Sequence, residues 1–193
     1  MNKEKIGLAI TGASGVRVGV RVAEYLSGLG YSLEIVVTRG AMKVAEYEDE
    51  IEPGLFKEKL SQTGNVYDED DYTSPLASSS SVPSTFIVAP ASMKTVAKIA
   101  LGISDNLVTR AALAVLRLGG TLVVAPRETP LGVAELRNIL ALAEMGARVV
   151  PLCVGFYHKP RSLDDVVDFL AGKILDAAGI ENSLYRRWAS RSP

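Results

Sequence analysis

The sequence predicts a doubly wound α/β domain, in which helices cover both faces of a parallel sheet. Apolar runs of strand length recur along the chain between segments of helical periodicity, and these runs are largely apolar without strict alternation, as in strands buried on both faces. The first run leads directly into the glycine turn 11–15 and then a helix. With 193 residues, of which 48% are hydrophobic, the chain can bury a sizeable core, so one domain over residues 1–193 is expected.

The expected elements follow from this rhythm in chain order. The apolar runs predict strands at residues 6–10, 33–38, 85–89, 121–125 and 147–152. The segments of helical pattern predict helices near residues 16–29, 40–48, 55–61, 93–101, 105–117, 132–145 and 163–178. Ligands of such sheets bind outside the carboxyl ends of the strands. Functional side chains are therefore expected directly after each strand.

Composition excludes several classes of function. The net charge is −1 and the sequence pI is near 5.9, so neither nucleic acid nor a membrane surface is expected as a partner. The single Cys153 and single His158 exclude a disulfide framework and a Cys/His metal cluster, and both are interpreted as structural. No metal is expected. The first residues show neither a signal peptide nor a membrane span, which predicts a cytoplasmic protein.

The turn after the first expected strand is predicted to hold a phosphate. The segment Thr11-Gly12-Ala13-Ser14-Gly15 has small residues that let an anion approach the backbone, and the first N–H groups of the following helix favour negative charge. Dinucleotide enzymes, flavoproteins and phosphosugar enzymes share this opening, so the turn alone leaves the ligand open.

Two later strand-end segments carry residues suited to an anionic ligand. Ser92-Met93-Lys94-Thr95 begins a helix and predicts a second anion site, although plain helix capping by Ser92 explains the same residues. Arg127 and Glu128 lie between two prolines that fix their directions. They form either a buried ion pair, or a cation and a proton-transferring carboxylate beside a ligand.

Three further features are interpreted without a family in view, the first two of them in two ways. Arg110 and Arg117, two helical turns apart, are either solvated or part of an anion site. The stretch 67–83, an acidic run followed by serines, is predicted to be a mobile loop, either a solvated one or a lid or subunit contact. The aromatic and basic tail 181–193 needs a surface to pack on, and a neighbouring subunit is the expected support.

Together these segments resemble the UbiX-type flavin prenyltransferases. The resemblance rests on Thr11-Gly12-Ala13-Ser14-Gly15, Pro75-Leu76-Ala77-Ser78, residues 90–95, Asp105-Asn106-Leu107 with Arg110-Ala111-Ala112, residues 126–131 and 155–160, Asp168-Phe169 and Arg187-Trp188. It implies a flavodoxin-like Rossmann fold of three α/β/α layers around a parallel sheet. It also implies that the protein joins a dimethylallyl group from dimethylallyl phosphate to N5 and C6 of reduced FMN. The product would be prenylated FMN for a UbiD-type decarboxylase, made by a homo-oligomer, a dodecamer, with sites between subunits.

The same resemblance assigns site residues by position. FMN contacts fall on Gly12, Ala13, Ser14, Thr38, Ser92, Met93, Lys94, Thr95 and Arg127. The prenyl phosphate falls on Tyr157 and Lys173, with Arg110, Arg117 and Glu128 around the same pocket. Catalytic roles fall on Ser14 near flavin N5, on Glu48 and Glu128 as groups that move protons, on the two arginines, and on Trp188 as a π face for the allylic cation.

Three positions depart from the family pattern. Arg117 stands where lysine is common, Leu113 where an acidic residue is usual, and Ser79 where glycine is usual. Arginine keeps the positive charge of lysine but not its ability to donate a proton. These departures concern catalytic detail and leave the FMN cradle intact.

Three other functions fit the residues less well. An NADP-dependent reductase suits the glycine turn and Arg39, but no tyrosine is followed four residues later by lysine. A flavin-dependent cysteine decarboxylase has a catalytic histidine after the first turn, where this chain has Val16 and Arg17. A non-catalytic FMN carrier leaves the residues assigned to the prenyl phosphate without a purpose.

One motif is interpreted as structural despite its pattern. Asp164, Asp165 and Asp168 fit the D-D-x-x-D arrangement by which prenyl diphosphate enzymes hold magnesium. Ser162 precedes them as a helix N-cap, and acids in a first turn complement the helix dipole. Capping is therefore the preferred explanation.

Overall fold

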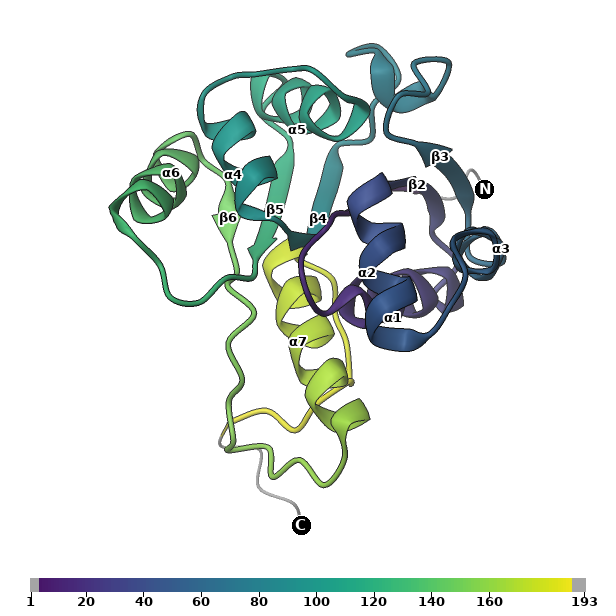
Figure 1. Ribbon diagram of the computed structural model, residues 1–193, viewed down its shortest axis with the longest axis vertical. Coiled ribbons are helices and arrows are strands. Elements are labelled where there is room, and N and C mark those ends of the chain that lie inside the picture. The colour runs from purple at the N-terminus through teal and green to yellow at the C-terminus, as the bar shows by residue number, and fades with distance from the viewer. Residues whose placement is uncertain (1–3, 189–193) are drawn as a thin grey trace.

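The computed structural model describes residues 4–188 and contains a six-stranded, fully parallel sheet of order β3-β2-β1-β4-β5-β6 (Figure 1). The strands are β1 (Lys5–Ile10), β2 (Ser32–Val37), β3 (Asn65–Asp68), β4 (Thr85–Ala91), β5 (Thr121–Pro126) and β6 (Arg148–Val149). With the short edge strand β3 set aside, the order is that of flavodoxin-like sheets. The predicted fold class is confirmed.

Helices cover both faces of the sheet and give the chain three layers (Figure 1). One face carries α1 (Val16–Gly28), α2 (Arg39–Asp49), α3 (Pro53–Ser61) and α7 (Leu163–Ala178). The other carries α4 (Met93–Ala100), α5 (Leu107–Arg117), α6 (Val133–Glu144) and the 3-10 turn Pro75–Ala77. None of the helices in the described part of the chain is both long and apolar enough to cross a membrane.

The two hydrophobic cores follow from the alternation of side chains along each strand. Ile6, Leu8 and Ile10 of β1 pack with the face of α1 and α7, whereas Ala9 packs with the face of α4 and α5. Since both faces of the central strands are buried, their sequences are mostly apolar, with Glu34 of β2 as a buried charged exception.

The structure differs from the predicted strands at both edges of the sheet. β3 was not predicted, because it is only four residues long and its first and last residues are exposed polar ones. At the other edge the expected strand 147–152 is reduced to Arg148–Val149. The chain still follows β5 beyond this point, since Val150 N donates to Val124 O at 2.8 Å and Leu152 N to Pro126 O at 3.0 Å.

The stretch 67–83, predicted to be a loop, contains the end of β3 and the 3-10 turn Pro75–Ala77. The Tyr67 hydroxyl donates to the buried carboxylate of Glu34 at 2.8 Å. The burial of Tyr67, and to a lesser extent this hydrogen bond, raises the pKa of Tyr67 to about 12. Leu76 is fully buried, and Ser81 Oγ donates to Pro75 O at 2.7 Å. The segment is therefore attached to the rest of the domain through the Tyr67–Glu34 hydrogen bond and the buried Leu76 side chain.

Candidate functional site

The central feature of the candidate site is the point where the chain leaves β1 and β4 in opposite directions. These strands are neighbours, but α1 packs on one face of the sheet and α4 on the other, which leaves a crevice at their carboxyl ends. The buried Thr11 joins the two strand ends: its Oγ1 donates to Pro90 O at 2.8 Å and accepts from Ser92 N at 2.8 Å. The glycine turn and the start of α4 are thus fixed relative to each other.

A cavity of about 150 Å³ lies in this crevice, lined largely by hydroxyl, ammonium and small residues. The residues in its lining that were predicted to contact FMN are Gly12, Thr38, Ser92, Lys94 and Thr95. The other five were not predicted as FMN contacts, and they are Thr11, Gly40, Glu69, Lys98 and Asn106. Sites for drug-sized ligands are typically about 300–1,000 Å³, so the cavity has room for a phosphate group but not for a whole flavin nucleotide.

Two helix N-termini face the cavity. Ser92 caps α4 by accepting from Thr95 N at 3.3 Å, and Thr38 caps α2 by accepting from Ala41 N at 3.1 Å. Capping by Ser92 is therefore present, and it leaves other N–H groups of the first turn of α4 available to an anion. Lys94, exposed beside them, has no charged partner among residues 4–188.

The glycine turn is held against α2 at both ends of that helix. A Cβ on Gly12 would lie 2.9 Å from Gly40 Cα, so the two backbones meet where side chains have no room. Gly15 has φ +91°, the left-handed conformation that favours glycine, and its N–H donates to Glu48 Oε2 at 2.9 Å. Glu48 therefore lies at the glycine turn, with one carboxylate oxygen already occupied, and its assigned role in proton transfer stays a prediction.

The predicted residues after β5 and on α5 are exposed. Arg127 and Glu128 form no ion pair within residues 4–188, and Glu128 Oε1 accepts from Thr129 N at 2.9 Å. The interpretation of these two residues as a buried ion pair is wrong. Arg110 Nε donates to Ala77 O, and Arg110 lines a hollow of about 570 Å³ together with side chains of the stretch 72–81. Arg117 is the last residue of α5 and is exposed.

Tyr157, Lys173 and Trp188 lie around α7 and do not line the strand-end cavity. The rings of Tyr157 and Trp188 meet edge to face with centroids 5.4 Å apart. Lys173 Nζ lies 5.8 Å from the centroid of the Tyr185 ring and lines a largely apolar groove of about 530 Å³ along α7. A single chain therefore presents the predicted FMN residues and the predicted prenyl-phosphate residues at separate places.

Comparison with known proteins assigns this arrangement to a family. The model of the Flavoprotein family matches residues 1–175. The flavin prenyltransferase UbiX of Methanothermobacter thermautotrophicus is 42% identical over 184 residues, which cover 95% of each chain. The chain belongs to the UbiX flavin prenyltransferase family.

Solved structures of UbiX proteins share the fold over nearly the whole chain. AnUbiX (PadA1), in complex with FMN and dimethylallyl pyrophosphate, has a TM-score of 0.92 and 31% identity, covering 99% of this chain and 100% of its own. A dodecameric FMN-dependent UbiX-like decarboxylase from Escherichia coli O157:H7 has a TM-score of 0.89 and 34% identity, covering 96% and 100%.

In this UbiX-family chain the described part of the tail packs on its own helix α7. Asp176 of α7 accepts from Asn182 Nδ2 at 2.8 Å, from the Tyr185 hydroxyl at 2.5 Å and from Arg187 at 2.7 Å. Gly172 makes room for the tail, since a Cβ there would lie 2.5 Å from the Tyr185 ring. The expected contact of the tail with a neighbouring subunit stays a prediction, and residues 189–193 lie outside the described part.

Replacing Asp176 by alanine is expected to lower the free energy of unfolding by about 1–3 kcal/mol at pH 7, because three donors lose a partly buried acceptor. Burial alone would raise the pKa of Asp176, but Arg187 and then Tyr185 outweigh it and lower the pKa. The carboxylate therefore stabilises the fold above its unfolded pKa of about 3.9, and this contribution disappears as the pH falls below that value.

Urea unfolding of the parent and the Asp176→Ala variant between pH 7 and pH 2.5 measures this effect. The difference between them should shrink below about pH 4. Glu181→Ala, at an exposed tail position, is the control. A difference that stays constant over the whole range would contradict the assignment to this carboxylate.

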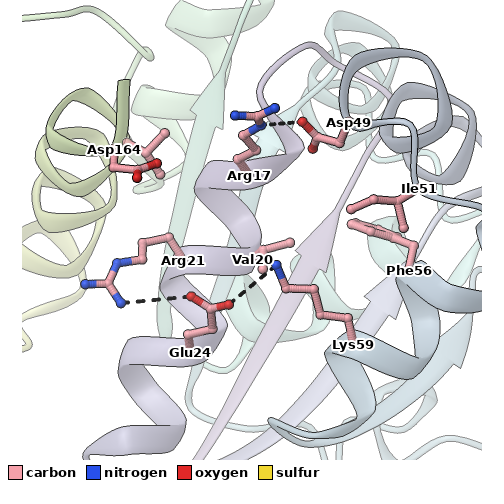
Figure 2. Close-up of a pocket in the computed structure, with 10 residues that line it drawn as sticks. Arg17, Val20, Arg21, Glu24, Asp49, Ile51, Phe56, Lys59 and Asp164 are labelled. Carbon is pink, nitrogen blue, oxygen red and sulfur yellow. Dashed lines mark hydrogen bonds and ion pairs between the residues drawn. The ribbon is translucent and has the colours of Figure 1, made fainter. Parts of the chain in front are cut away.

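Ser162 caps α7 as predicted, with Asp165 N donating to Ser162 Oγ at 3.2 Å, and the three carboxylates of the D-D-x-x-D pattern have different surroundings. Asp165 accepts from Arg161 N at 2.6 Å and Ser162 N at 3.0 Å, and these backbone bonds lower its pKa. Asp168 pairs with Arg21 at 2.5 Å. Asp164 lines a groove of about 320 Å³ between α1, α3 and α7 (Figure 2).

Charged side chains, most of them in ion pairs, line the groove in Figure 2 together with the apolar Val20, Ile51 and Phe56. Arg17 pairs with Asp49, and Glu24 pairs with both Arg21 and Lys59 at 3.9 and 3.7 Å. No group of three or more metal-ligating side chains is found within residues 4–188. His158 stacks on Phe169 with centroids 4.5 Å apart, which supports the structural role expected for it.

Proposed function

We propose that this UbiX-family protein transfers a dimethylallyl group from a dimethylallyl phosphate donor to N5 and C6 of reduced FMN, giving prenylated FMN. The observation that carries the proposal is the hydroxyl-lined cavity at the β1–β4 crevice, with the first turn of α4 and Lys94 facing it. Backbone N–H groups, hydroxyls and an ammonium are the donors that a phosphate monoester needs. The fold, the family and this donor set all support FMN as the ligand whose phosphate occupies this cavity.

FMN binding is assigned to the residues around this cavity and the adjoining strand ends. Thr38, Ser92, Lys94 and Thr95 hold the phosphate, and Gly12 allows it to approach the backbone. The further positions assigned to FMN are Ala13, Ser14, Met93 and Arg127, each of which closely follows β1, β4 or β5. Ser14 provides a hydroxyl on the turn that Glu48 holds.

The prenyl donor needs cations on one side and π faces on the other. Ionisation of an allylic phosphate breaks its C–O bond and leaves a phosphate dianion and a carbocation. Arg110, Arg117 and Lys173 supply positive charge, and the Tyr157 hydroxyl supplies a donor. Trp188, next to Tyr157, offers a π face to the cation.

We propose that the site is completed between subunits of a homo-oligomer. Arg110 and Arg117 lie on α5 whereas Lys173 and Tyr157 lie around α7, so one chain does not gather them, and the cavity at the crevice is small for FMN. The UbiX-like structure from Escherichia coli is dodecameric, and a dodecamer is proposed here. Light scattering showing a single chain in an active preparation would contradict this.

The partner that receives the product is proposed to be a UbiD-type decarboxylase in the cytoplasm. Prenylated FMN is a cofactor, so its maker requires a recipient enzyme. Activation of a cofactor-free UbiD-type decarboxylase by the reaction mixture, and not by FMN alone, tests this transfer.

Anaerobic incubation with reduced FMN and either dimethylallyl phosphate or dimethylallyl pyrophosphate tests the reaction. Mass spectrometry is expected to show a flavin heavier by one prenyl unit, and the two arms identify the donor. FMN that is bound tightly but stays unmodified with both donors would favour a non-catalytic FMN carrier. Loss of carbon dioxide from a peptidyl cysteine, without prenylation, would favour a decarboxylase of the cysteine type.

A further inference from the structure

Glu69 directly follows β3 and lines the cavity at the β1–β4 crevice. Its Oε1 accepts from Arg39 N, the first N–H of α2, at 3.0 Å. Its Oε2 accepts from Asn106 Nδ2, in the N-cap residue of α5, at 3.0 Å. Its backbone carbonyl also accepts from Leu107 N at 2.8 Å. One residue therefore joins the starts of two helices to the wall of the cavity.

The chemistry of these contacts requires a carboxylate. Arg39 N is a backbone donor and cannot accept. Asn106 cannot exchange its amide oxygen for its nitrogen, because Oδ1 already accepts from Thr109 N at 3.0 Å as the cap of α5. Both groups facing the Glu69 side chain are thus donors, and a glutamine would turn its own NH₂ group toward one of them. The two donors, Arg39 N and Asn106 Nδ2, therefore match the two acceptor oxygens of the Glu69 carboxylate.

The two helices that Glu69 joins carry residues of the proposed reaction. α2 begins at the cavity with Thr38 as its cap, and Glu48 in its last turn accepts from Gly15 N of the glycine turn. α5 begins beside Glu69 and carries Arg110 in its first turns. A shift at Glu69 would therefore move the wall of the phosphate cavity and the start of the helix that carries the cations.

We propose that Glu69 is a positioning residue that sets the FMN phosphate cavity by holding the N-termini of α2 and α5 through two acceptors. This inference rests on the proposed function, because it places the phosphate of FMN in that cavity. The carboxylate occupies the N-terminus of α2, so the N-terminus of α4 with Lys94 is the one left to the phosphate.

A double-variant cycle tests the donor and acceptor matching. Glu69→Gln places a donor against a donor, and Asn106→Asp places an acceptor against an acceptor. Each is expected to weaken FMN binding by about 10-fold or more, since hydrogen bonds to charged groups are lost. In the double variant the glutamine NH₂ group can donate to the carboxylate oxygen that replaces Asn106 Nδ2, while the glutamine carbonyl accepts from Arg39 N. Aspartate also caps a helix as well as asparagine does. The double variant is therefore expected to recover FMN affinity to within about 3-fold of the parent.

The measurements are the dissociation constant of FMN from quenching of its fluorescence, and the KM for FMN against kcat. Thermal unfolding confirms that each variant is folded at the temperature used. Asp70→Asn is the control, because Asp70 pairs with Arg39 at 2.7 Å on the open surface, and it is expected to change FMN affinity by less than about 2-fold.

Each outcome decides the proposal. Weakened single variants and a recovered double variant support it. Single variants that bind FMN like the parent, or a double variant whose loss is the sum of the two single losses, overturn it. A role in stability alone would lower the unfolding temperature without changing the FMN dissociation constant of the folded protein, which also overturns it. Failure of the parent itself to bind FMN would contradict the proposed function instead.

Discussion

Gly19→Ala is expected to lower the free energy of unfolding by about 3 kcal/mol, the upper end of the cost of overpacking a core. Gly19 lies on the buried side of α1, where a Cβ would stand 2.2 Å from the carbonyl oxygen of Ala89 in β4 and 3.0 Å from Ile10 Cγ1. A backbone oxygen cannot turn aside as a flexible side chain can, so α1 must move away from the sheet. Urea unfolding measures the change.

Gly28→Ala in the same helix is the matched control and is expected to have the opposite sign. Nothing lies within 4 Å of a Cβ at Gly28. Alanine there gains roughly 0.5–1 kcal/mol through its better helix propensity. Equal effects of the two substitutions would show that close packing of α1 on β4 does not limit stability. The Gly19 variant is also expected to bind FMN more weakly, since Ala89 precedes Pro90, whose carbonyl accepts from Thr11.

Much of the fold could be predicted because its central strands are buried on both faces. β1, β2, β4 and β5 give largely apolar runs, interrupted in β2 by the buried Glu34, and the helices between them have clear apolar faces. The edge strands lack this signal: β3 is short with polar ends, and β6 has only two residues. Strands this short have too few residues to show either a continuous apolar run or an alternation of apolar and polar residues.

The candidate site could be predicted only in part. The sequence predicted functional side chains after each strand because a doubly wound sheet places ligands there, and the resemblance assigned residues after β1, β2 and β4 to FMN. Thr11 was noted only as part of the glycine turn, and Glu69 only as part of an acidic stretch. Their partners Pro90, Arg39 and Asn106 lie 79, 30 and 37 residues away in the sequence. Such matching of donors to acceptors depends on tertiary structure and leaves no local motif.

Glu128→Gln is expected to lower kcat for flavin prenylation by about 10²-fold or more, the usual contribution of a positioned acid or base. Glu128 directly precedes Thr129, whose N–H donates to Glu128 Oε1 at 2.9 Å. Glutamine keeps an oxygen that can accept this bond, so the side chain retains its anchor and loses only its charge and its ability to carry a proton. The substitution therefore separates proton transfer from positioning.

The measurements that distinguish these roles are single-turnover prenylation, followed by mass spectrometry, and the dissociation constant of FMN. FMN affinity is expected to stay within about 2-fold of the parent, because Glu128 does not line the phosphate cavity. Glu144→Gln, at the exposed end of α6, is the control for loss of one negative charge and is expected to react like the parent. Undiminished turnover by Glu128→Gln would remove Glu128 from the proton-transfer step and leave Glu48, with one carboxylate oxygen held by the Gly15 N–H, as the remaining carboxylate candidate.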